Sequence, residues 1–140
     1  MKVSAGAADR TAAAEKPASV DQSIAPSLVP VEQAIDLAHL ARMTFGEPSL
    51  EREVLSLFDR QATMLLARMG DAPPAVAAAL AHTLKGSARG IGAWKVAEAA
   101  EGVESLAAKP GAVTLAQAVD RLSASVTEAR AAIVELLRPH

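Results

Sequence analysis

The sequence predicts an all-α protein, an antiparallel up-down four-helix bundle with a short additional helix at its N-terminal side. Its hydrophobic share of 51% consists mostly of Ala, Leu and Val with 2% aromatic residues, a composition that favours helices over strands. Apolar residues recur at steps of three and four along several long segments. Proline and glycine separate these segments by short connections, so consecutive long helices should lie antiparallel.

The chain is expected to hold one folded domain, because 140 residues do not provide two independent cores. Residues 1–29 are rich in Ala, Ser and Pro without helical periodicity and are predicted to be a disordered leader, followed by the bundle domain at 30–138. The leader has no continuous apolar stretch of the signal-peptide kind, and no segment approaches the roughly 20 apolar residues that cross a bilayer. A soluble cytoplasmic protein is expected.

The short leading helix is predicted at about 31–44 and the first long helix at about 50–69, with Ser49 as its N-cap. The apolar stripe predicted to face the core of this long helix consists of Leu50, Val54, Leu57, Phe58, Leu65 and Met69. Gln61 interrupts that stripe with no explanation from the sequence.

Three further helices complete the predicted bundle. Asp71 and the two prolines that follow it indicate a helix start, and this helix is expected to run to about Gly90. The next is expected at about 93–108 and the last at about 114–137. The helix at 93–108 should bury its apolar positions and expose a polar face consisting of Lys95, Glu98, Glu101 and Glu104.

The third of the five predicted helices carries an outward-facing histidine. A helix turns by 100° per residue, so four residues lie on the side opposite His82, about 140° to 200° away, and are expected to face the core. They are Leu80, Leu84, Ser87 and Ile91. Within about 60° of His82 lie two cations and four small residues: Lys85, Arg89, Gly86, Ala75, Ala78 and Ala79. His82 is therefore predicted to face solvent.

This group of residues suits phosphoryl transfer. A neutral imidazole can attack phosphorus near pH 7 without a dedicated base. Lys85 and Arg89 can form charge-assisted hydrogen bonds with a phosphoryl group, and Gly86 leaves room for a partner's active site. The three alanines offer a surface of methyl groups for docking.

The run His82-Thr83-Leu84-Lys85-Gly86-Ser87-Ala88, followed by Ile91-Gly92-Ala93, resembles the hallmark of the histidine phosphotransfer family. The resemblance implies that His82 is the phosphorylated residue, that Lys85 and Gly86 shape its surroundings, and that the bundle docks a receiver domain whose aspartate gives or takes the phosphoryl group. Many members have a glutamine near the phosphohistidine, and the matching position here is Glu104, a departure because a carboxylate repels phosphate.

The resemblance also implies the partners: response-regulator receiver domains, a hybrid histidine kinase, or both. Mg²⁺ is expected on the partner receiver, and no cofactor or metal on this chain. With a net charge of -2, neither nucleic acid nor a membrane is an expected partner, and a monomer is expected.

The same sequence allows other interpretations. A full histidine kinase would need an ATP-binding domain, for which the chain has neither a glycine-rich phosphate loop nor the length. A non-catalytic helical adaptor that binds a receiver stays open. The Asp36-x-x-His39 spacing has no second pair for a di-metal centre, so His39 and His140 are interpreted as background. Trp94 is expected to be a core residue or an anchor at a helix start.

Overall fold

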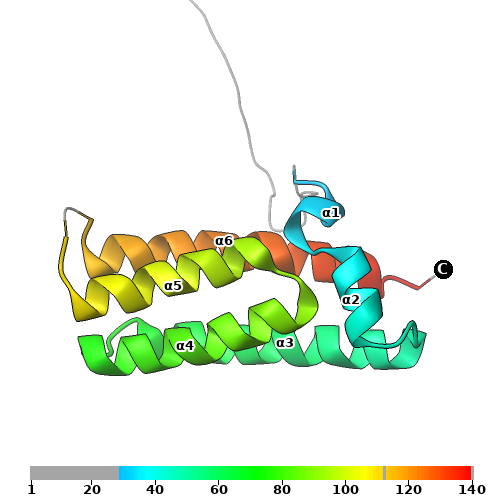
Figure 1. Ribbon diagram of the computed structural model, residues 1–140, viewed down its shortest axis with the longest axis horizontal. Coiled ribbons are helices and arrows are strands. Elements are labelled where there is room, and N and C mark those ends of the chain that lie inside the picture. Colours follow the sequence, from blue (N-terminus) through cyan, green and yellow to red (C-terminus); the bar gives the residue numbers. More distant parts are fainter. Residues whose placement is uncertain (1–28, 112, 140) are drawn as a thin grey trace, which may run out of the picture.

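The computed structural model describes residues 29–111 and 113–139, and in these ranges it is helical without strands, which confirms the all-α class. The elements are α1 (Val31–Ala34), α2 (Leu37–Met43), α3 (Pro48–Met69), α4 (Pro74–Ile91), α5 (Trp94–Ala108) and α6 (Leu115–Leu137). Figure 1 shows α3, α4, α5 and α6 lengthwise beside one another, each running opposite to the helix before it. Apart from residue 29, the predicted leader lies outside the described residues. No helix in the described ranges has the length and apolarity needed to cross a membrane.

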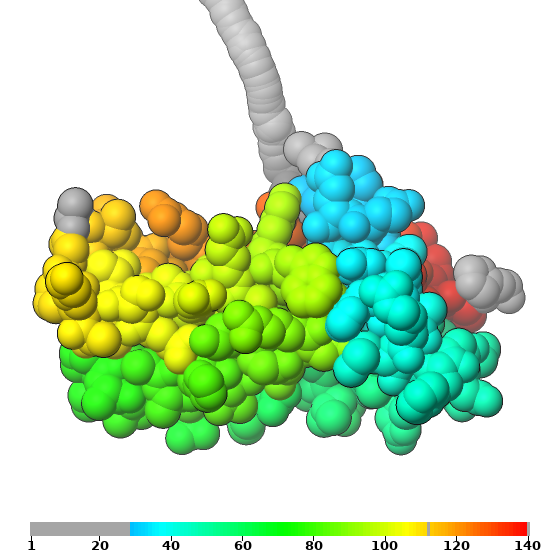
Figure 2. Space-filling model, viewed as in Figure 1, coloured from blue at the N-terminus to red at the C-terminus, as the bar shows by residue number. Residues whose placement is uncertain are grey.

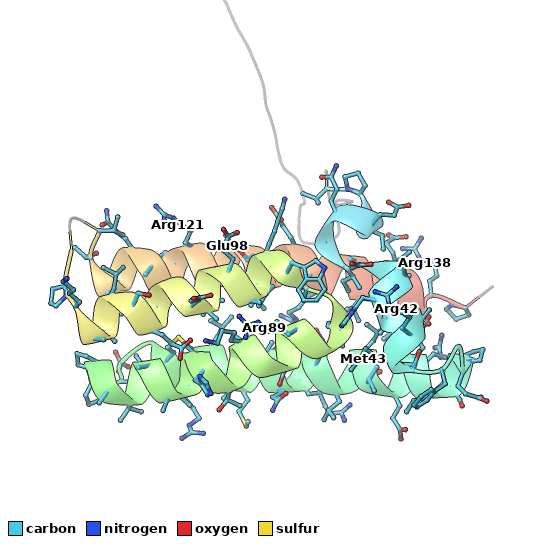
Figure 3. All side chains as sticks on the ribbon, viewed as in Figure 1. Arg42, Met43, Arg89, Glu98, Arg121 and Arg138 are labelled. Atoms are coloured by element: carbon cyan, nitrogen blue, oxygen red, sulfur yellow. The ribbon has the colours of Figure 1, made fainter. Side chains whose placement is uncertain are left out.

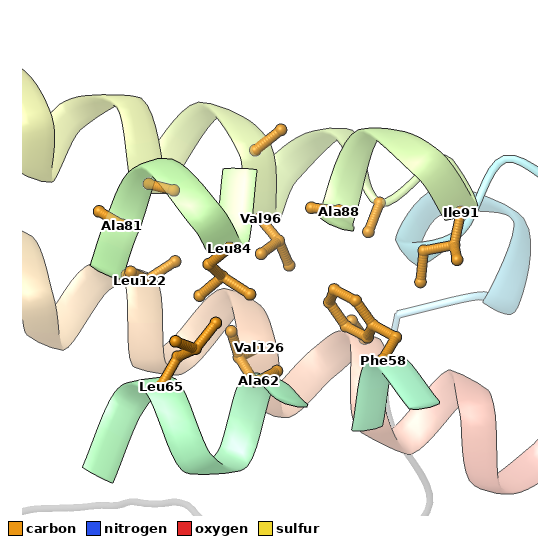
Figure 4. Close-up of a cluster of buried hydrophobic side chains, with 14 of the residues drawn as sticks. Phe58, Ala62, Leu65, Ala81, Leu84, Ala88, Ile91, Val96, Leu122 and Val126 are labelled. Atoms are coloured by element: carbon orange, nitrogen blue, oxygen red, sulfur yellow. The ribbon is translucent and has the colours of Figure 1, made fainter. Parts of the chain in front are cut away.

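The inner face of α4 lies at the centre of the core. Its buried residues are Ala77, Leu80, Ala81, Leu84, Ala88 and Ile91. Figure 4 shows Leu84 directed into the space between Leu65, Leu122 and Val126, which come from α3 and α6. Full burial of a leucine stabilises a fold by about 1.5–3 kcal/mol.

Alanine lines the contact between α4 and α5, which pack more extensively on each other than any other two helices in the described ranges. Ala81 and Ala88 of α4 and Ala97 and Ala100 of α5 are all buried. Their small side chains allow the two helix backbones to approach closely. We call these four residues the alanine seam.

The predicted core stripe of α3 is partly wrong, because Leu57 is 53% exposed. The buried residues of α3 are Leu55, Phe58, Ala62, Leu65 and Met69, which alternate steps of three and four. This stripe faces α4 and α6 together, since α3 packs on both. The helix is therefore rotated relative to the prediction, and Leu57 moves out of the core.

The leading helix is divided in two, which corrects the single helix predicted at 31–44. Ile35 is fully buried and has an extended backbone (φ -136°, ψ 126°). Asp36 then begins α2 as its N-cap, with Oδ1 accepting a hydrogen bond from the His39 backbone N–H at 3.0 Å. The break exists because the Asp36 backbone N–H donates to the Gly92 carbonyl at 2.9 Å instead of continuing α1.

Two predicted helix starts are also corrected. α3 begins at Pro48 with Glu47 as N-cap, ahead of Ser49, and α4 begins at Pro74 with Pro73 as N-cap, beyond Asp71. Neither N-cap makes a side-chain capping hydrogen bond. In both helices a proline at the first position presets the helical φ angle and lacks the N–H group that would need a cap.

Gly92 joins α2 to the turn between α4 and α5. It ends α4 in the left-handed conformation (φ 77°), and a Cβ atom there would lie 2.8 Å from the Asp36 Cβ. The Trp94 indole N–H donates to Asp36 Oδ2 at 3.0 Å, and His39 Nε2 lies 2.9 Å from the Arg89 carbonyl oxygen. Figure 2 shows α2, in cyan, packed against this yellow-green turn. The junction fixes α2 at the C-terminal end of α4.

Gly92→Ala is expected to lower the free energy of unfolding by about 1–3 kcal/mol, because alanine there combines a positive φ with a close approach to Asp36. Gly90→Ala is the matched control: an added Cβ at this helical position meets nothing within 4 Å, and stability should rise by about 0.5–1 kcal/mol. Urea unfolding followed by circular dichroism measures both. Equal effects of the two substitutions would contradict this account of the junction.

Candidate functional site

His82 lies on the outer face of α4, as predicted, and its side chain is 71% exposed. Its position follows from the burial of Leu80, Ala81 and Leu84 around it in the sequence, which turns the inner face of α4 to the core. The imidazole is therefore accessible to a partner from solvent.

Glu104 of α5 reaches across to His82. Its Oε2 lies 2.9 Å from His82 Nδ1, and its Oε1 lies 2.6 Å from Lys85 Nζ. The side chains of Glu104 and Lys85 are only 23% and 15% exposed. The prediction that Glu104 lies on a solvated face is wrong, because the close approach of α5 to α4 places it beside the histidine.

The proton on the His82 ring is assigned by this contact. An ionised carboxylate only accepts hydrogen bonds, so Nδ1 must carry the hydrogen and donate it to Glu104. In the neutral ring, Nε2 then keeps a free lone pair. The available nucleophilic nitrogen is Nε2.

The carboxyl of Glu104 is ionised at neutral pH. Burial alone would raise its pKa, but the interactions with Lys85 and His82 outweigh burial and hold the pKa below its ordinary value. Oε1 is buried, and the Lys85 ammonium 2.6 Å away compensates its charge there.

The α4 edge next to α5 is charged beyond this pair. Arg89 is 55% exposed, and its guanidinium lies 3.8 Å from the Glu101 carboxylate. Figure 3 shows Arg89 between the ribbons of α4 and α5. Its loose ion pair leaves it able to contact another anion.

The side chains on the α4 edge next to α3 are small and apolar. Ala75 and Ala79 are exposed on this edge, whereas Ala78 is half-buried and lies on the opposite, α5 side of His82. A Cβ added to Gly86 would meet nothing within 4 Å. Nothing inside the fold therefore requires glycine at position 86. The surface there is open to an approaching molecule.

Exposed apolar side chains continue this surface on α2 and α3. Met43, Leu57 and Met64 are 52%, 53% and 52% exposed, and we call these three residues the apolar ridge. A pocket lined by Met43, Leu57, Ser87 and Gly90 joins the ridge to α4. The ridge was not predicted, although Met64 falls outside the apolar period of its helix and was the available signal.

The sequence matches the pattern of one known protein family. The Hpt domain pattern matches residues 53–132, more than half of the chain, including all of α4 and α5. The chain belongs to the Hpt domain family. No curated protein and no solved structure matched it. Hpt domains are phosphotransfer carriers of phosphorelays and interact with receiver domains and histidine kinases, rather than being enzymes with their own ATP site.

Several other predictions concerned residues outside the immediate surroundings of His82 in this Hpt domain. Gln61, unexplained in the sequence, accepts a hydrogen bond from the Ser87 hydroxyl at 2.6 Å across the α3–α4 contact. Trp94 is 46% exposed and is the first residue of α5, so it anchors a helix start and is not a core residue. His140 lies outside the described residues.

Asp36 and His39 form a cap and a helix contact at the Gly92 junction. In 29–111 and 113–139, no three His, Cys, Asp or Glu side chains gather as metal ligands would.

Lys85→Met should raise the pKa of the Glu104 carboxyl toward its ordinary value, because it removes the adjacent ammonium. A folded-state pKa below the unfolded one contributes stability above the unfolded pKa, and this contribution is lost as pH falls through the folded pKa. The wild type should therefore lose more stability than Lys85→Met on acidification below about pH 4.5. Carbon-13 NMR titration of the Glu104 carboxyl tests the shift, and an unchanged titration in the variant would contradict it.

Proposed function

We propose that this Hpt domain is a phosphorelay intermediate in which His82 accepts a phosphoryl group from a receiver-domain aspartate and passes it to another receiver. The observation that carries the proposal is the exposed His82 ring with Nδ1 donating to Glu104, which leaves Nε2 unblocked. The framework we propose is an antiparallel up-down bundle over 30–138.

The proposed transfer uses a nucleophile from this chain and a leaving group from the partner. The Nε2 lone pair of His82 attacks phosphorus, the bond from phosphorus to the aspartyl oxygen breaks, and the partner's carboxylate leaves with the electron pair. Lys85 and Arg89 compensate the charge of the phosphoryl group. We place the Mg²⁺ on the partner receiver. Gly86 contributes the clearance that brings the two reacting groups within bonding distance.

We further propose that the receiver docks on the α3 side of His82. Ala75, Ala79 and Gly86 offer a low surface there, and the apolar ridge beside them provides area that loses contact with water on docking. Ala78, on the α5 side, would lie at the margin of the contact. With the receiver docked on the α3 side, the charged α5 side of α4 is not covered by the contact and stays beside His82 and the phosphoryl group.

His82→Ala should abolish acid-labile labelling when the chain is mixed with a phosphorylated receiver domain, because no other group is proposed as the phosphoryl acceptor. His140→Gln is the control and should label like the wild type. Labelling of His82→Ala at the wild-type level would refute the relay role. Receiver binding by the wild type without any transfer would instead favour a non-catalytic adaptor.

Leu57→Glu should weaken receiver binding by roughly tenfold or more, because it introduces a charge into an apolar contact. Val134→Glu is the matched control, since Val134 is an aliphatic residue of α6 that is 61% exposed and outside the ridge. Isothermal titration calorimetry with the receiver measures both affinities. An equal loss of affinity in the two variants would place docking elsewhere.

A further inference from the structure

We infer that Glu104 makes phosphorylated His82 a short-lived donor, by keeping a proton on Nδ1 so that the ring departs as neutral imidazole. The inference rests on the proposed function and gives Glu104 the part of a positioning residue. It concerns the lifetime of the phosphorylated state rather than its formation.

The position of Glu104 is fixed on both of its oxygens. Oε2 lies 2.9 Å from His82 Nδ1 and Oε1 lies 2.6 Å from Lys85 Nζ, with the Glu104 side chain only 23% exposed. Nε2, which would carry the phosphoryl group, is on the other side of the same ring. Phosphorylation at Nε2 therefore leaves the Nδ1 contact with Glu104 available.

The protonation of Nδ1 decides what leaves when the N–P bond breaks. With a proton on Nδ1, the phosphorylated ring is cationic, and the electron pair of the N–P bond returns to Nε2 to give neutral imidazole. Without that proton, the leaving group would be the imidazolate anion, which is far more basic and leaves more slowly. The new bond forms from phosphorus to an oxygen of the receiver's aspartate or of water.

A carboxylate favours the protonated ring more than an amide would. Glu104 brings a negative charge to Nδ1–H, and the charge-assisted hydrogen bond is stronger than one to a neutral amide oxygen. The ring should therefore stay protonated, and labile, to higher pH with glutamate than with glutamine. A glutamate at position 104 is therefore expected to shorten the lifetime of phosphorylated His82 compared with a glutamine.

The surrounding charges act in the same direction. Lys85 is shared between Glu104 and the incoming phosphoryl group, which carries about two negative charges. Arg89 from α4 and Glu101 from α5 are the other charged neighbours and partly offset each other at 3.8 Å. On α3 the apolar ridge is followed, one turn after Met64, by the exposed cation Arg68. The phosphoryl group thus receives less compensation than it would beside a neutral residue 104.

The test compares loss of label from the full chain phosphorylated by phosphoramidate, a small-molecule donor that does not need a receiver. Glu104→Gln should slow the loss roughly three- to tenfold near neutral pH, and its loss should begin to slow at lower pH than that of the wild type. Glu98→Gln, which removes the same charge from an exposed position on another face of α5, should behave like the wild type. Glu104→Asp, which keeps the carboxylate, should restore part of the lability.

The results of these measurements distinguish a failure of this inference from a failure of the proposed relay function. Labelling at His82 with identical lifetimes and pH profiles in the wild type and Glu104→Gln would overturn the inference and leave the relay function standing. No labelling of His82 by phosphoramidate or by a phosphorylated receiver would overturn both. Circular dichroism checks that each variant is folded, and Glu104→Ala, which also lacks the carboxylate, replaces Glu104→Gln if the latter is not.

Discussion

The burial of one face of α4 is the constraint on which the other features of the site depend. Leu80, Leu84 and Ile91 are enclosed by the neighbouring helices, and a helix turns by about 100° per residue. Once these side chains are inside, His82 can only be outside. The same rotation brings Lys85 to the edge beside α5 and Gly86 to the edge beside α3. A change in the packing of α4 would therefore move the nucleophile, its cation and its cleared space together.

The two edges of α4 have opposite character, and this separates chemistry from recognition. Toward α5, charged groups surround the ring and set its proton, its orientation and the electrostatic environment of a bound phosphoryl group. Toward α3, small residues and the apolar ridge offer an exposed apolar area. In the docking mode proposed above, the partner gains binding energy on the α3 side while its aspartate meets His82 at the boundary between the two edges. Substitutions on the two sides can then change affinity and reactivity separately.

Much of this arrangement could be predicted because it is local to one helix. The outward direction of His82 and its neighbours on α4 follow from periodicity alone. The family resemblance pointed to Glu104 as a neighbour of His82, but periodicity could not give their contact, because it joins residues 22 positions apart and depends on the register of α5 against α4. The break at Ile35 depends likewise on a backbone hydrogen bond from Asp36 to Gly92. The prediction that Leu57 is buried failed for a different reason. Two overlapping stripes of apolar residues on α3 fit the same spacing, and only the packing of α3 on both α4 and α6 decides which stripe is buried.

The alanine seam has a consequence for how the site can vary. His82 and Glu104 belong to different helices, so their hydrogen bond depends on the separation of two backbones as well as on the two side chains. Ala81, Ala88, Ala97 and Ala100 determine that separation from inside the protein. A larger residue at any of them would force the helices apart, at a cost of about 1–3 kcal/mol. Such a change would lengthen the contact between the imidazole and its carboxylate while leaving every surface residue in place, so the surroundings of the histidine depend on buried residues as well as on exposed ones.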